Sequence, residues 1–425
     1  MASGSTRTVA IVAGEASGDL NGAYLATALR RISPGLDICG VGGKHMREAG
    51  VRLLADSSAW SAIGVSEALR LVPRLLIELR KLRAHFEANP PDVLLLIDFG
   101  AFNLRLARQL RRGRSKVFYY YPPGSWNRSS RYQCLEGIVD RIVTPFPWSA
   151  ETLRKRGFHA DFYGHPLLDI VKPSLPRSSF CERFGFDSNK PLIGLLPGSR
   201  AQEISYNLPV LLISAARLAA CMPDLQFAFP VAASLPLSNI AHELKSIPWI
   251  DIAGIESESL IDGKRTFDIE RHVRAMALAD KFAFPTSPVR VHVLPGMSVD
   301  VLANAHGAVI ASGSATVEAL ILGCPMVIIY RGSKLTTLEY RLRGKHIKFI
   351  GMPNIIADRE ICPELVAEAA TPSCISELML ALITDTPQRA KMLNELAEAR
   401  AILGQPGAVE KTARAVLELL NASSP

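Results

Sequence analysis

The chain of 425 residues is 48% hydrophobic and 21% charged, which excludes a disordered protein and favours two folded domains over a single core. Its formal net charge of +8 predicts an anionic partner, namely a phosphorylated substrate, a membrane surface or nucleic acid. Nucleic acid ranks last and is not expected, because only 7% of the residues are aromatic and no run interleaves them with basic residues.

The sequence also bears on the compartment. The first residues lead directly into a predicted strand, without the apolar helix and cleavage site of a secretory signal. No uninterrupted apolar run approaches the length of a membrane span. The seven cysteines form no Cys-x-x-Cys pair, which argues for reduced thiols and against a zinc site. We therefore expect a cytoplasmic protein with no metal and no cofactor.

Strands and helices alternate in the first half of the chain. A buried strand at 8–12 precedes a helix at 19–31. The pattern continues with strands at 38–41, 93–97 and 116–121, short strands near Arg141 and Asp161, and helices at 66–87 and 104–111. Such alternation predicts a parallel, doubly wound sheet.

The second half restarts this pattern at Leu192, with later strands at 226–230, 291–294, 307–311 and 326–330. A Pro- and Ser-rich junction at 172–177 suggests these divisions: an N-terminal lobe at 1–172, a linker at 173–190, a C-terminal lobe at 191–403 and a C-terminal helix within 404–425. The charged segment 257–290 looks like an insertion, helical at 269–279. Two Rossmann-like α/β lobes match the GT-B architecture, in which ligands bind at the carboxyl ends of strands.

Two turns in the second half have features of phosphate sites. Pro197-Gly198-Ser199-Arg200 closes the apolar stretch 191–196, and Ser312-Gly313-Ser314 follows the strand 307–311. Each turn leads into a helix, whose N-terminus favours anions. Arg200 adds a planar fork that can grip phosphate, although a surface salt bridge is the alternative. Together the turns predict a bound diphosphate, most simply that of a nucleotide-sugar.

Other polar residues allow two interpretations each. Asp98 follows a strand and could be a general base or a helix cap. The turn from Gly14 to Asp19 could approach a ligand closely, or only cap the next helix. Glu318 could hold ribose hydroxyls or complement the helix dipole, and Asn354 could bind ligand or form an Asx turn. His165 is more often a structural residue in such a position.

The segment 66–86 places apolar residues at helical spacing and surrounds them with arginine and lysine. A core helix with a solvated basic face is the usual meaning of this pattern. The alternative is an interfacial helix that touches anionic lipid. The contact residues would then be Leu69, Arg70, Val72, Arg74, Leu75, Leu76, Arg80 and Lys81.

Taken together, an ordered set of motifs resembles the lipid-A-disaccharide synthase family. The matching residues are Gly14 to Asp19, Gly40 to Gly43 with Met46, Gly64-Val65, Pro91 to Val93 through Asp98, Phe102-Asn103, Gly164-His165-Pro166, Leu196 to Arg200 with Glu203-Ile204, Ser312 to Glu318, Gly323 to Val327, Tyr330-Arg331, Pro353 to Glu360 and Pro363 to Leu365. Their order and spacing over most of the chain are more specific than any single motif.

The resemblance implies an inverting glycosyltransferase of GT-B fold, peripheral on the inner membrane. It would transfer 2,3-diacylglucosamine from UDP to the 6-hydroxyl of 2,3-diacylglucosamine 1-phosphate, without metal, and a homodimer is plausible in the family. Asp98 matches the family's essential carboxylate, Arg200 its phosphate-binding arginine and Asn354 its donor-side asparagine. The substrate contacts that we expect are Ser17, Asn103, Arg200, Ser312, Gly313, Ser314, Thr316, Glu318, Asn354 and Glu360.

The chain departs from the family pattern on the acceptor lobe. Gly100-Ala101 replaces Pro-Asp, which removes a second carboxylate, and Pro122 to Asn127 replaces a Ser-Val-Trp-Ala-Trp stretch. The sequence therefore supports a UDP-sugar donor more strongly than it supports this particular acceptor. The alternatives are a GT-B transferase with another acceptor, a UDP-sugar epimerase, and a non-catalytic relative that binds nucleotide-sugar or lipid.

Overall fold

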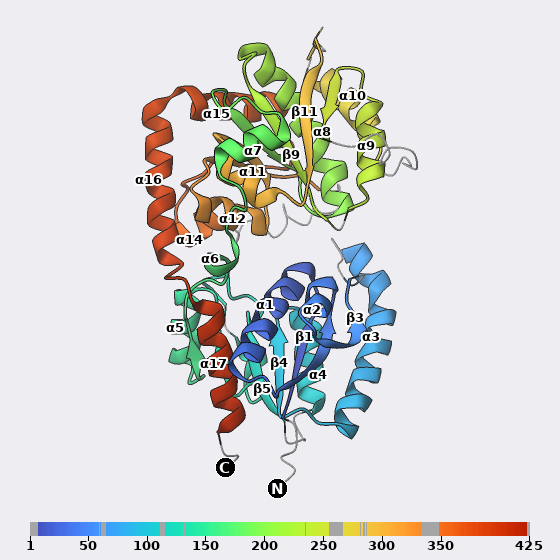
Figure 1. The fold of residues 1–425 in the computed structure, drawn as a ribbon, viewed down its shortest axis with the longest axis vertical. Coiled ribbons are helices and arrows are strands. Elements are labelled where there is room, and N and C mark those ends of the chain that lie inside the picture. Colours follow the sequence, from blue (N-terminus) through green and yellow to red (C-terminus); the bar gives the residue numbers. More distant parts are fainter. Residues whose placement is uncertain are drawn as a thin grey trace. The chain divides into compact units, whose positions relative to one another are not determined.

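The computed structural model describes residues 7–58, 60, 65–110, 115–130, 132–233, 235–254, 267–280, 282–283, 285, 287–332 and 348–422, except for the side chains of 65–71 and 279. The chain forms two compact units (Figure 1). Residues 1–170 and 402–425 make the N-terminal unit, and residues 171–401 make the C-terminal unit.

A parallel seven-stranded sheet forms the centre of the N-terminal unit, in the order β3-β2-β1-β4-β5-β6-β7. Its strands are β1 (Thr8–Ala13), β2 (Asp37–Gly42), β3 (Arg52–Asp56), β4 (Val93–Ile97), β5 (Lys116–Tyr120), β6 (Arg141–Val143) and β7 (Ala160–Asp161). Both faces are buried, because Leu94 and Leu96 of β4 join one core cluster while Val93, Leu95 and Ile97 join the other. This two-sided burial explains the continuous apolar runs of the central strands.

Helices cover both faces of this sheet. α3 (Val65–Ala88) and α4 (Gly100–Leu110) pack in one cluster, and α1 (Ala16–Ile32) and α17 (Ala408–Asn421) pack in the other. The remaining helices are α2 (Lys44–Glu48), the 3-10 turn η1 (Gln133–Leu135), α5 (Pro147–Lys155) and α6 (Leu167–Ile170). α1 and α17 lie side by side although they come from opposite ends of the chain (Figure 1).

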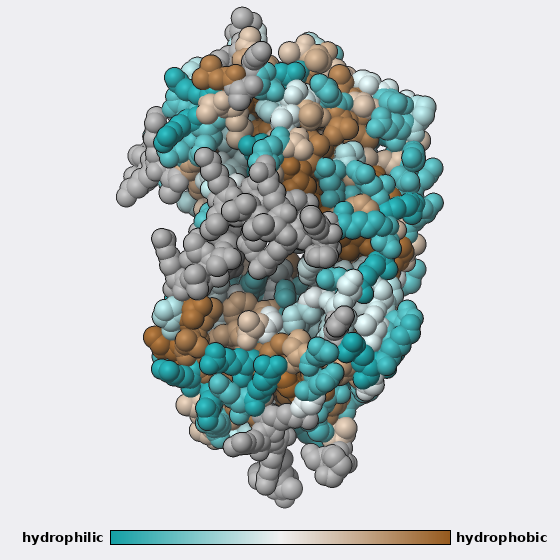
Figure 2. Space-filling view, turned by 180° about the vertical axis from the view of Figure 1, so that it is seen from behind, coloured by the Kyte–Doolittle hydropathy of each residue, from teal (hydrophilic) through white to brown (hydrophobic). Residues whose placement is uncertain are grey.

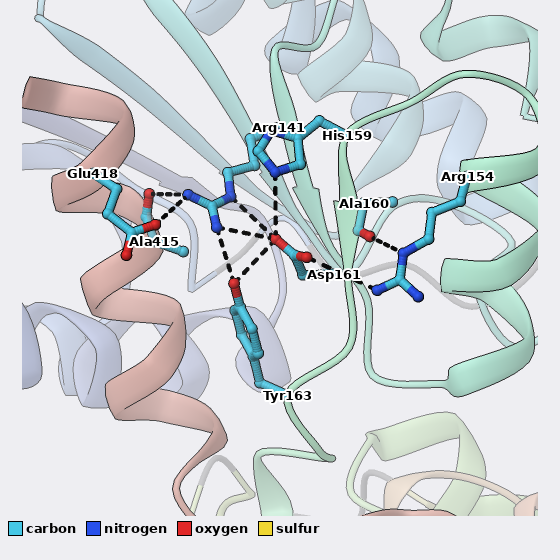
Figure 3. Close-up of polar contacts among 8 residues, drawn as sticks. All are labelled: Arg141, Arg154, His159, Ala160, Asp161, Tyr163, Ala415 and Glu418. Atoms are coloured by element: carbon cyan, nitrogen blue, oxygen red, sulfur yellow. Dashed lines mark hydrogen bonds and ion pairs between the residues drawn. The ribbon is translucent and has the colours of Figure 1, made fainter. Parts of the chain in front are cut away.

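An arginine network fixes α17 to the edge of this sheet (Figure 3). The buried Arg141 of β6 donates through Nε to Asp161 (3.1 Å) and through Nη2 to the Tyr163 hydroxyl (2.9 Å). Its Nη1 donates to Glu418 (2.7 Å) and to the carbonyl of Ala415 (3.2 Å), both on α17. The predicted C-terminal helix therefore belongs to the N-terminal unit and is not a separate segment.

The C-terminal unit is built on a second parallel sheet, in the order β10-β11-β9-β8-β12-β13-β14. Its strands are β8 (Leu192–Leu196), β9 (Gln226–Val231), β10 (Ile250–Ala253), β11 (Val289–Pro295), β12 (Gly307–Ala311), β13 (Met326–Tyr330) and β14 (Glu364–Val366). Its helices are α7 (Arg177–Phe184), α8 (Ala201–Cys221), α9 (Leu237–Lys245), α10 (Ile269–Ala279), α11 (Ser298–Asn304), α12 (Ser314–Leu322), α14 (Met352–Ala357), the 3-10 turn η4 (Ala367–Ala369), α15 (Pro372–Thr384) and α16 (Thr386–Ile402).

Two parts of this unit differ from the expected divisions. The expected linker contains α7, whose Phe180 is fully buried in the core of the C-terminal unit. The expected insertion contributes α10 and the start of β11, and α10 packs against α8 and α9. The buried carboxylate of Glu243 accepts hydrogen bonds from the amides of Phe267 (2.6 Å) and Ile269 (2.8 Å), which fixes the start of α10.

α8 is long and apolar enough to meet the length and composition criteria for a membrane span. Its most apolar 18-residue window has a mean hydropathy of 1.4, and 67% of that window is buried in the protein. The sequence interpretation expected a helix to begin after the turn 197–200 but found no apolar run of this length. Its side chains from Leu208 to Ala216 are buried, as expected of a helix in the core.

We expect Arg141→Met to lower the free energy of unfolding by about 3 kcal/mol and to loosen the docking of α17, because it leaves Asp161 without its guanidinium partner and removes both bonds from Arg141 to α17. Glu418→Gln should cost less than about 1 kcal/mol, since the Glu418 side chain is 66% exposed. Hydrogen–deuterium exchange of the α17 amides measures both effects. Equal protection of α17 in the Arg141→Met variant and the wild type would show that apolar packing alone holds the helix.

Candidate active site

The strand order of the N-terminal sheet reverses between β1 and β4, which are direct neighbours. Ligands of doubly wound sheets bind in the crevice outside the carboxyl ends at such a reversal. Ala13 at the end of β1 pairs with Ile97 at the end of β4. The residues that follow, Gly14-Glu15 and Asp98, therefore leave the sheet next to each other.

Asp98 and Phe99 form a left-handed turn between β4 and α4, with φ angles of 46° and 48°. This conformation costs a residue with a side chain roughly 1–2 kcal/mol. The fully buried Asn103 stabilises the turn by donating from Nδ2 to the carbonyls of Asp98 (2.8 Å) and Ile97 (3.1 Å). The Tyr119 hydroxyl also donates to the Asp98 carbonyl (2.8 Å). Such strain is typical of functional positions.

Phe99 explains why Gly14 carries no side chain. A Cβ at Gly14 would overlap the Phe99 ring. That ring lies 6.1 Å from the centre of Trp60 and 5.4 Å from that of Phe102. The glycine thus permits close approach of an aromatic side chain of the same unit, where the sequence suggested close approach of a ligand.

The Asp98 side chain is accessible to solvent, although protein atoms surround most of it. The loss of water around the carboxyl group raises its pKa, and the negative charge of Glu15 raises it further, to about 6. A carboxylate tuned in this way is a better proton acceptor near neutral pH than an ordinary aspartate. The sequence interpretation gave Glu15 no role, because the pairing of β1 with β4 is not visible in the sequence.

Two other predicted residues of this unit have different surroundings. Ser17 is exposed at the start of α1, two residues after Glu15. Asn103 was predicted to contact substrate, but its side chain is fully buried and its amide group binds backbone carbonyls. We therefore assign Asn103 a positioning role. The buried Asp19 accepts from the amides of Gly43 (2.6 Å) and Met46 (3.0 Å) and so caps α2, not α1.

His165 has the structural role that the sequence favoured. Its ring is buried, lies 6.0 Å from the Tyr121 ring and 5.6 Å from the Phe146 ring, and accepts a hydrogen bond from the Leu167 amide (3.2 Å). Burial lowers the pKa of His165 to about 3, so the imidazole is neutral at physiological pH.

In the C-terminal unit, β8 and β12 are neighbours at the reversal of the strand order. The turns Pro197 to Arg200 and Ser312 to Ser314 follow these two strands. The structure therefore brings the two predicted phosphate sites to the same edge of one sheet. That edge is where ligands of this fold class bind.

In the turn Pro197 to Arg200, the backbone amides bind a glutamate from the helix that follows, α8. Glu203 Oε2 accepts hydrogen bonds from the amides of Ser199 (2.7 Å) and Arg200 (3.2 Å), and Oε1 accepts from Arg200 Nη1 (3.3 Å). Gly198 has φ 121°, and a Cβ there would overlap the Glu203 carboxylate. The amides that the sequence assigned to phosphate thus bind Glu203, and the turn holds the half-exposed Arg200 guanidinium in place.

The second turn is more open. Gly313 and Ser314 are exposed at the start of α12. Ser312 Oγ donates to the Ile350 carbonyl (2.7 Å), and Thr316 is buried and bonded to the Gly313 carbonyl (2.7 Å). Glu318 accepts from Ser298 Oγ (3.3 Å), and burial raises the pKa of its carboxyl group. Exposed backbone at this helix start suits an anion.

Asn354 was predicted to bind the donor, but it is fully buried. Its Oδ1 accepts from the amides of Ile361 (2.7 Å) and Cys362 (2.9 Å), and its Nδ2 donates to Glu364 (2.7 Å). Glu364, to which the sequence interpretation gave no role of its own, also accepts from the amides of Ile350 and Gly351. Asn354 therefore frames the loop that carries the exposed Glu360, and its amide group binds partners within the protein.

The predicted membrane helix divides into a buried part and an exposed part. Leu79, Leu82 and Phe86 belong to the core, whereas the exposed fraction is 43% for Val72 and 51% for Ile77. Leu75 and Leu76 are half-buried, Arg74, Arg80 and Lys81 are exposed, and the side chains of Leu69 and Arg70 lie outside the described residues. Figure 2 shows a hydrophobic patch at the edge of the N-terminal unit that carries α3.

Among the residues that the structure describes, no group of three or more histidine, cysteine, aspartate or glutamate side chains could hold a metal ion. A reaction without metal therefore stays a prediction.

Two doubly wound parallel sheets, each with polar turns at the point where the strand order reverses, define a protein of the GT-B glycosyltransferase fold class. A family model described as lipid-A-disaccharide synthetase matches residues 9–246 and 257–419. The chain belongs to this family, which confirms the resemblance stated from the sequence. The whole segment 257–290 lies within the match, so it is not an addition peculiar to this chain.

Curated relatives agree with the family match. The chain is 33% identical to the lipid-A-disaccharide synthase of Syntrophus aciditrophicus over 98% of this chain and 99% of the relative. It is 34% identical to the enzyme of the same name from Geobacter sulfurreducens over 99% of each chain. The assignment to a glycosyltransferase of lipid A synthesis is thereby confirmed.

Solved structures share the fold at low sequence identity. The UDP-GlcNAc 2-epimerase from Neisseria meningitidis, bound to UDP-GlcNAc, has a TM-score of 0.57 and 12% identity over 97% of this chain and 99% of that chain. The calicheamicin glycosyltransferase CalG4 has a TM-score of 0.55 and 14% identity, over 99% of this chain and 100% of that chain. These similarities confirm the two Rossmann-like lobes and show the fold alone.

We expect Tyr119→Phe to lower the free energy of unfolding by about 1 kcal/mol, because it removes one hydrogen bond from the Asp98 carbonyl. The Asp98 and Phe99 amides should exchange faster with deuterium, since the left-handed turn loses one of its supports. Tyr24→Phe on α1, where the side chain is exposed, is the matched control. Unchanged amide exchange in Tyr119→Phe would mean that Asn103 holds the turn by itself.

Proposed function

We propose that this chain transfers 2,3-diacylglucosamine from UDP-2,3-diacylglucosamine to the 6-hydroxyl of 2,3-diacylglucosamine 1-phosphate. The products are UDP and the β-1,6-linked lipid A disaccharide 1-phosphate. Family membership over nearly the whole chain supports this reaction class. The observation that carries the mechanism is Asp98, an accessible carboxylate with a raised pKa at the reversal point of the N-terminal sheet.

In this mechanism Asp98 acts as the general base. Its carboxylate takes the proton of the acceptor 6-hydroxyl as that oxygen attacks C1 of the donor sugar. The bond from C1 to the UDP oxygen breaks, and the electron pair leaves with UDP. Attack from the face opposite the leaving group inverts the configuration at C1 and gives the β linkage. Asn103 and Tyr119 fix the carboxylate through the backbone of Asp98.

The donor diphosphate is assigned to the C-terminal unit. The exposed start of α12 at Ser312 to Ser314, with Thr316 beneath it, supplies backbone amides, and Arg200 supplies a guanidinium oriented by Glu203. We assign Glu318 to the ribose hydroxyls, and the exposed Glu360 lies on the loop framed by Asn354, ahead of β14. An epimerase or a non-catalytic role has no separate support, because the epimerase structures share only the fold.

The direct test is release of UDP from UDP-2,3-diacylglucosamine, with and without 2,3-diacylglucosamine 1-phosphate, and with the disaccharide identified by mass spectrometry. Asp98→Asn should lower the rate about a hundred- to ten-thousandfold while the variant remains folded and binds UDP. UDP release that does not depend on the acceptor, or near-normal turnover of Asp98→Asn, would contradict the proposal.

The pH profile provides a second prediction. Because Asp98 must be ionised to accept the proton, kcat/KM for the acceptor should rise with pH to a plateau, with the midpoint near the raised pKa of about 6. Glu15→Gln removes a negative charge that raises the Asp98 pKa, so the midpoint should move to lower pH. An unchanged midpoint in Glu15→Gln would show that Glu15 does not act on the ionising group.

We further propose that α3 attaches the protein peripherally to the cytoplasmic face of the inner membrane. Both substrates carry acyl chains, and α3 presents Val72 and Ile77 to solvent beside exposed Arg74, Arg80 and Lys81. Exposed apolar side chains rimmed by basic residues suit an anionic bilayer surface. A homodimer remains an expectation from the family alone.

We expect the protein to co-sediment with anionic vesicles and to be released by salt. Each basic residue near such a surface contributes about 1 kcal/mol within a Debye length. Replacing Arg70, Arg74, Arg80 and Lys81 with serine should release it and reduce turnover of membrane-presented substrate more than of detergent-dispersed substrate. The control replaces Lys245, Arg271, Lys391 and Arg400, which are exposed on the C-terminal unit. Equal release by both variants would assign the binding to net charge rather than to α3.

A further inference from the structure

Tyr121 is the first residue after β5 and leaves the sheet directly beside the turn of Asp98. β4 and β5 pair so that Ile97 is opposite Tyr120, and the Asp98 amide donates to the Tyr120 carbonyl (3.1 Å). Neighbouring strands are about 4.8 Å apart. The side chains of Asp98 and Tyr121 therefore start from adjacent points on the carboxyl edge of the N-terminal sheet.

The backbone turns away from β5 at Tyr121 in the left-handed conformation, with φ 60°. This conformation is unfavourable for a residue with a bulky side chain. The Tyr121 amide nevertheless donates to the Val143 carbonyl of β6 (3.1 Å), which holds the strained backbone against the neighbouring strand. Asp98 and Phe99 have the same conformation at the end of β4. Two adjacent strand ends thus carry strain, which is typical of functional positions.

Two neighbouring rings hold the Tyr121 ring in one orientation. Its centre lies 4.9 Å from that of Tyr120, with an interplanar angle of 78°, and 6.0 Å from that of His165, with an angle of 89°. Aromatic pairs prefer such edge-to-face arrangements. Tyr120 and His165 are buried, whereas Tyr121 is partly exposed. Tyr121 is therefore a fixed side chain with a part that a ligand can reach.

The Tyr121 hydroxyl is available to a ligand. Its side chain has the ring contacts given above but no hydrogen bond to any residue that the structure describes, whereas the Tyr119 hydroxyl donates to the Asp98 carbonyl. Loss of water raises the pKa of the Tyr121 hydroxyl, and interactions with Tyr120 and Asp98 raise it further, so the group stays protonated. A phenol can donate one hydrogen bond. Beside a carboxylate, an uncharged donor suits a sugar oxygen better than a phosphate, which the Asp98 charge would repel.

The acceptor of the proposed reaction has two free hydroxyl groups. Its 1-position carries phosphate and its 2- and 3-positions carry acyl groups, which leaves the 4- and 6-hydroxyls. Only attack by the 6-hydroxyl gives the 1,6 linkage, so the protein needs a contact that separates the two groups. Within one hexose the two hydroxyls are close together. With the 6-hydroxyl at Asp98, a side chain on the neighbouring strand end is well placed to contact the 4-hydroxyl.

We propose that the Tyr121 hydroxyl donates a hydrogen bond to the 4-hydroxyl of the acceptor while Asp98 takes the proton of the 6-hydroxyl, and that this contact selects the 6-hydroxyl for transfer. The inference rests on the proposed function, which supplies the acceptor. A lone pair of the 4-oxygen that accepts from Tyr121 is withheld from attack on C1. The same contact orients the sugar with its 6-oxygen toward the carboxylate. Tyr121 is thus a specificity-determining residue, and Asp98 is the base.

The test compares 2,3-diacylglucosamine 1-phosphate with its 4-deoxy analogue, by turnover in detergent and by calorimetric binding in the presence of UDP. The wild type should bind the analogue roughly three- to tenfold more weakly, because one hydrogen bond is lost. Tyr121→Phe should bind both acceptors with this lower affinity, while its donor KM and its UDP affinity stay unchanged. NMR of its product should detect 1,4-linked disaccharide, which forms when the 4-oxygen attacks C1, its proton passes to Asp98 and UDP leaves.

The matched control is Tyr120→Phe, which removes the neighbouring buried hydroxyl and keeps the ring. It should discriminate between the two acceptors as the wild type does and give only 1,6-linked product. Equal binding of both acceptors by the wild type, undiminished discrimination in Tyr121→Phe, or a change in its donor KM alone would overturn the contact. Lost discrimination with only 1,6-linked product would overturn the selection of the hydroxyl. Wild-type discrimination in binding that Tyr121→Phe loses, without turnover of either acceptor, would contradict the proposed function and leave the contact supported.

Discussion

The pairing of β1 with β4 determines where Asp98, the proposed general base, lies. Because Ala13 pairs with Ile97, the residues that follow them, among them Glu15 and Asp98, leave the carboxyl edge of the sheet next to each other. The loss of water around the Asp98 carboxyl group raises its pKa, and the negative charge of Glu15 raises it further. The left-handed turn at Asp98 is unfavourable on its own, so buried Asn103 and Tyr119 are needed to present one accessible carboxylate.

Internal carboxylates decide which helix starts are available to a ligand. Glu203 binds the amides at the start of α8, and Glu243 does the same for α10. The start of α12 has Gly313 at the cap position, and no side chain caps it among the described residues. A strand-to-helix turn is therefore a phosphate site only where no acidic residue of the protein has taken the same position. This argument favours α12 for the diphosphate and leaves Arg200 as the contribution of α8.

The sequence predicts the central strands well because parallel strands buried on both faces appear as continuous apolar runs. It misses β3, β10 and β14, which are short or only partly buried. The sequence predicts Asp98 from its position after a strand. The effect of Glu15 on Asp98 becomes visible only when the pairing of β1 with β4 is known. Asn103 and Asn354 show a further limit, since an amide that binds a ligand and an amide that binds backbone are the same group in a sequence. Only burial and hydrogen-bond partners separate the two roles.

The electrostatics of the edge make Asp98 a well-defined proton acceptor. Burial lowers the pKa of His165 to about 3, so the imidazole stays uncharged while Asp98 titrates. Burial also raises the pKa of the Tyr119 and Tyr121 hydroxyls, which therefore stay protonated. These three rings thus keep fixed protonation states in the range where the Asp98 carboxyl group ionises. The protons of these rings therefore do not compete with the proton that the proposed base Asp98 would accept from a sugar hydroxyl.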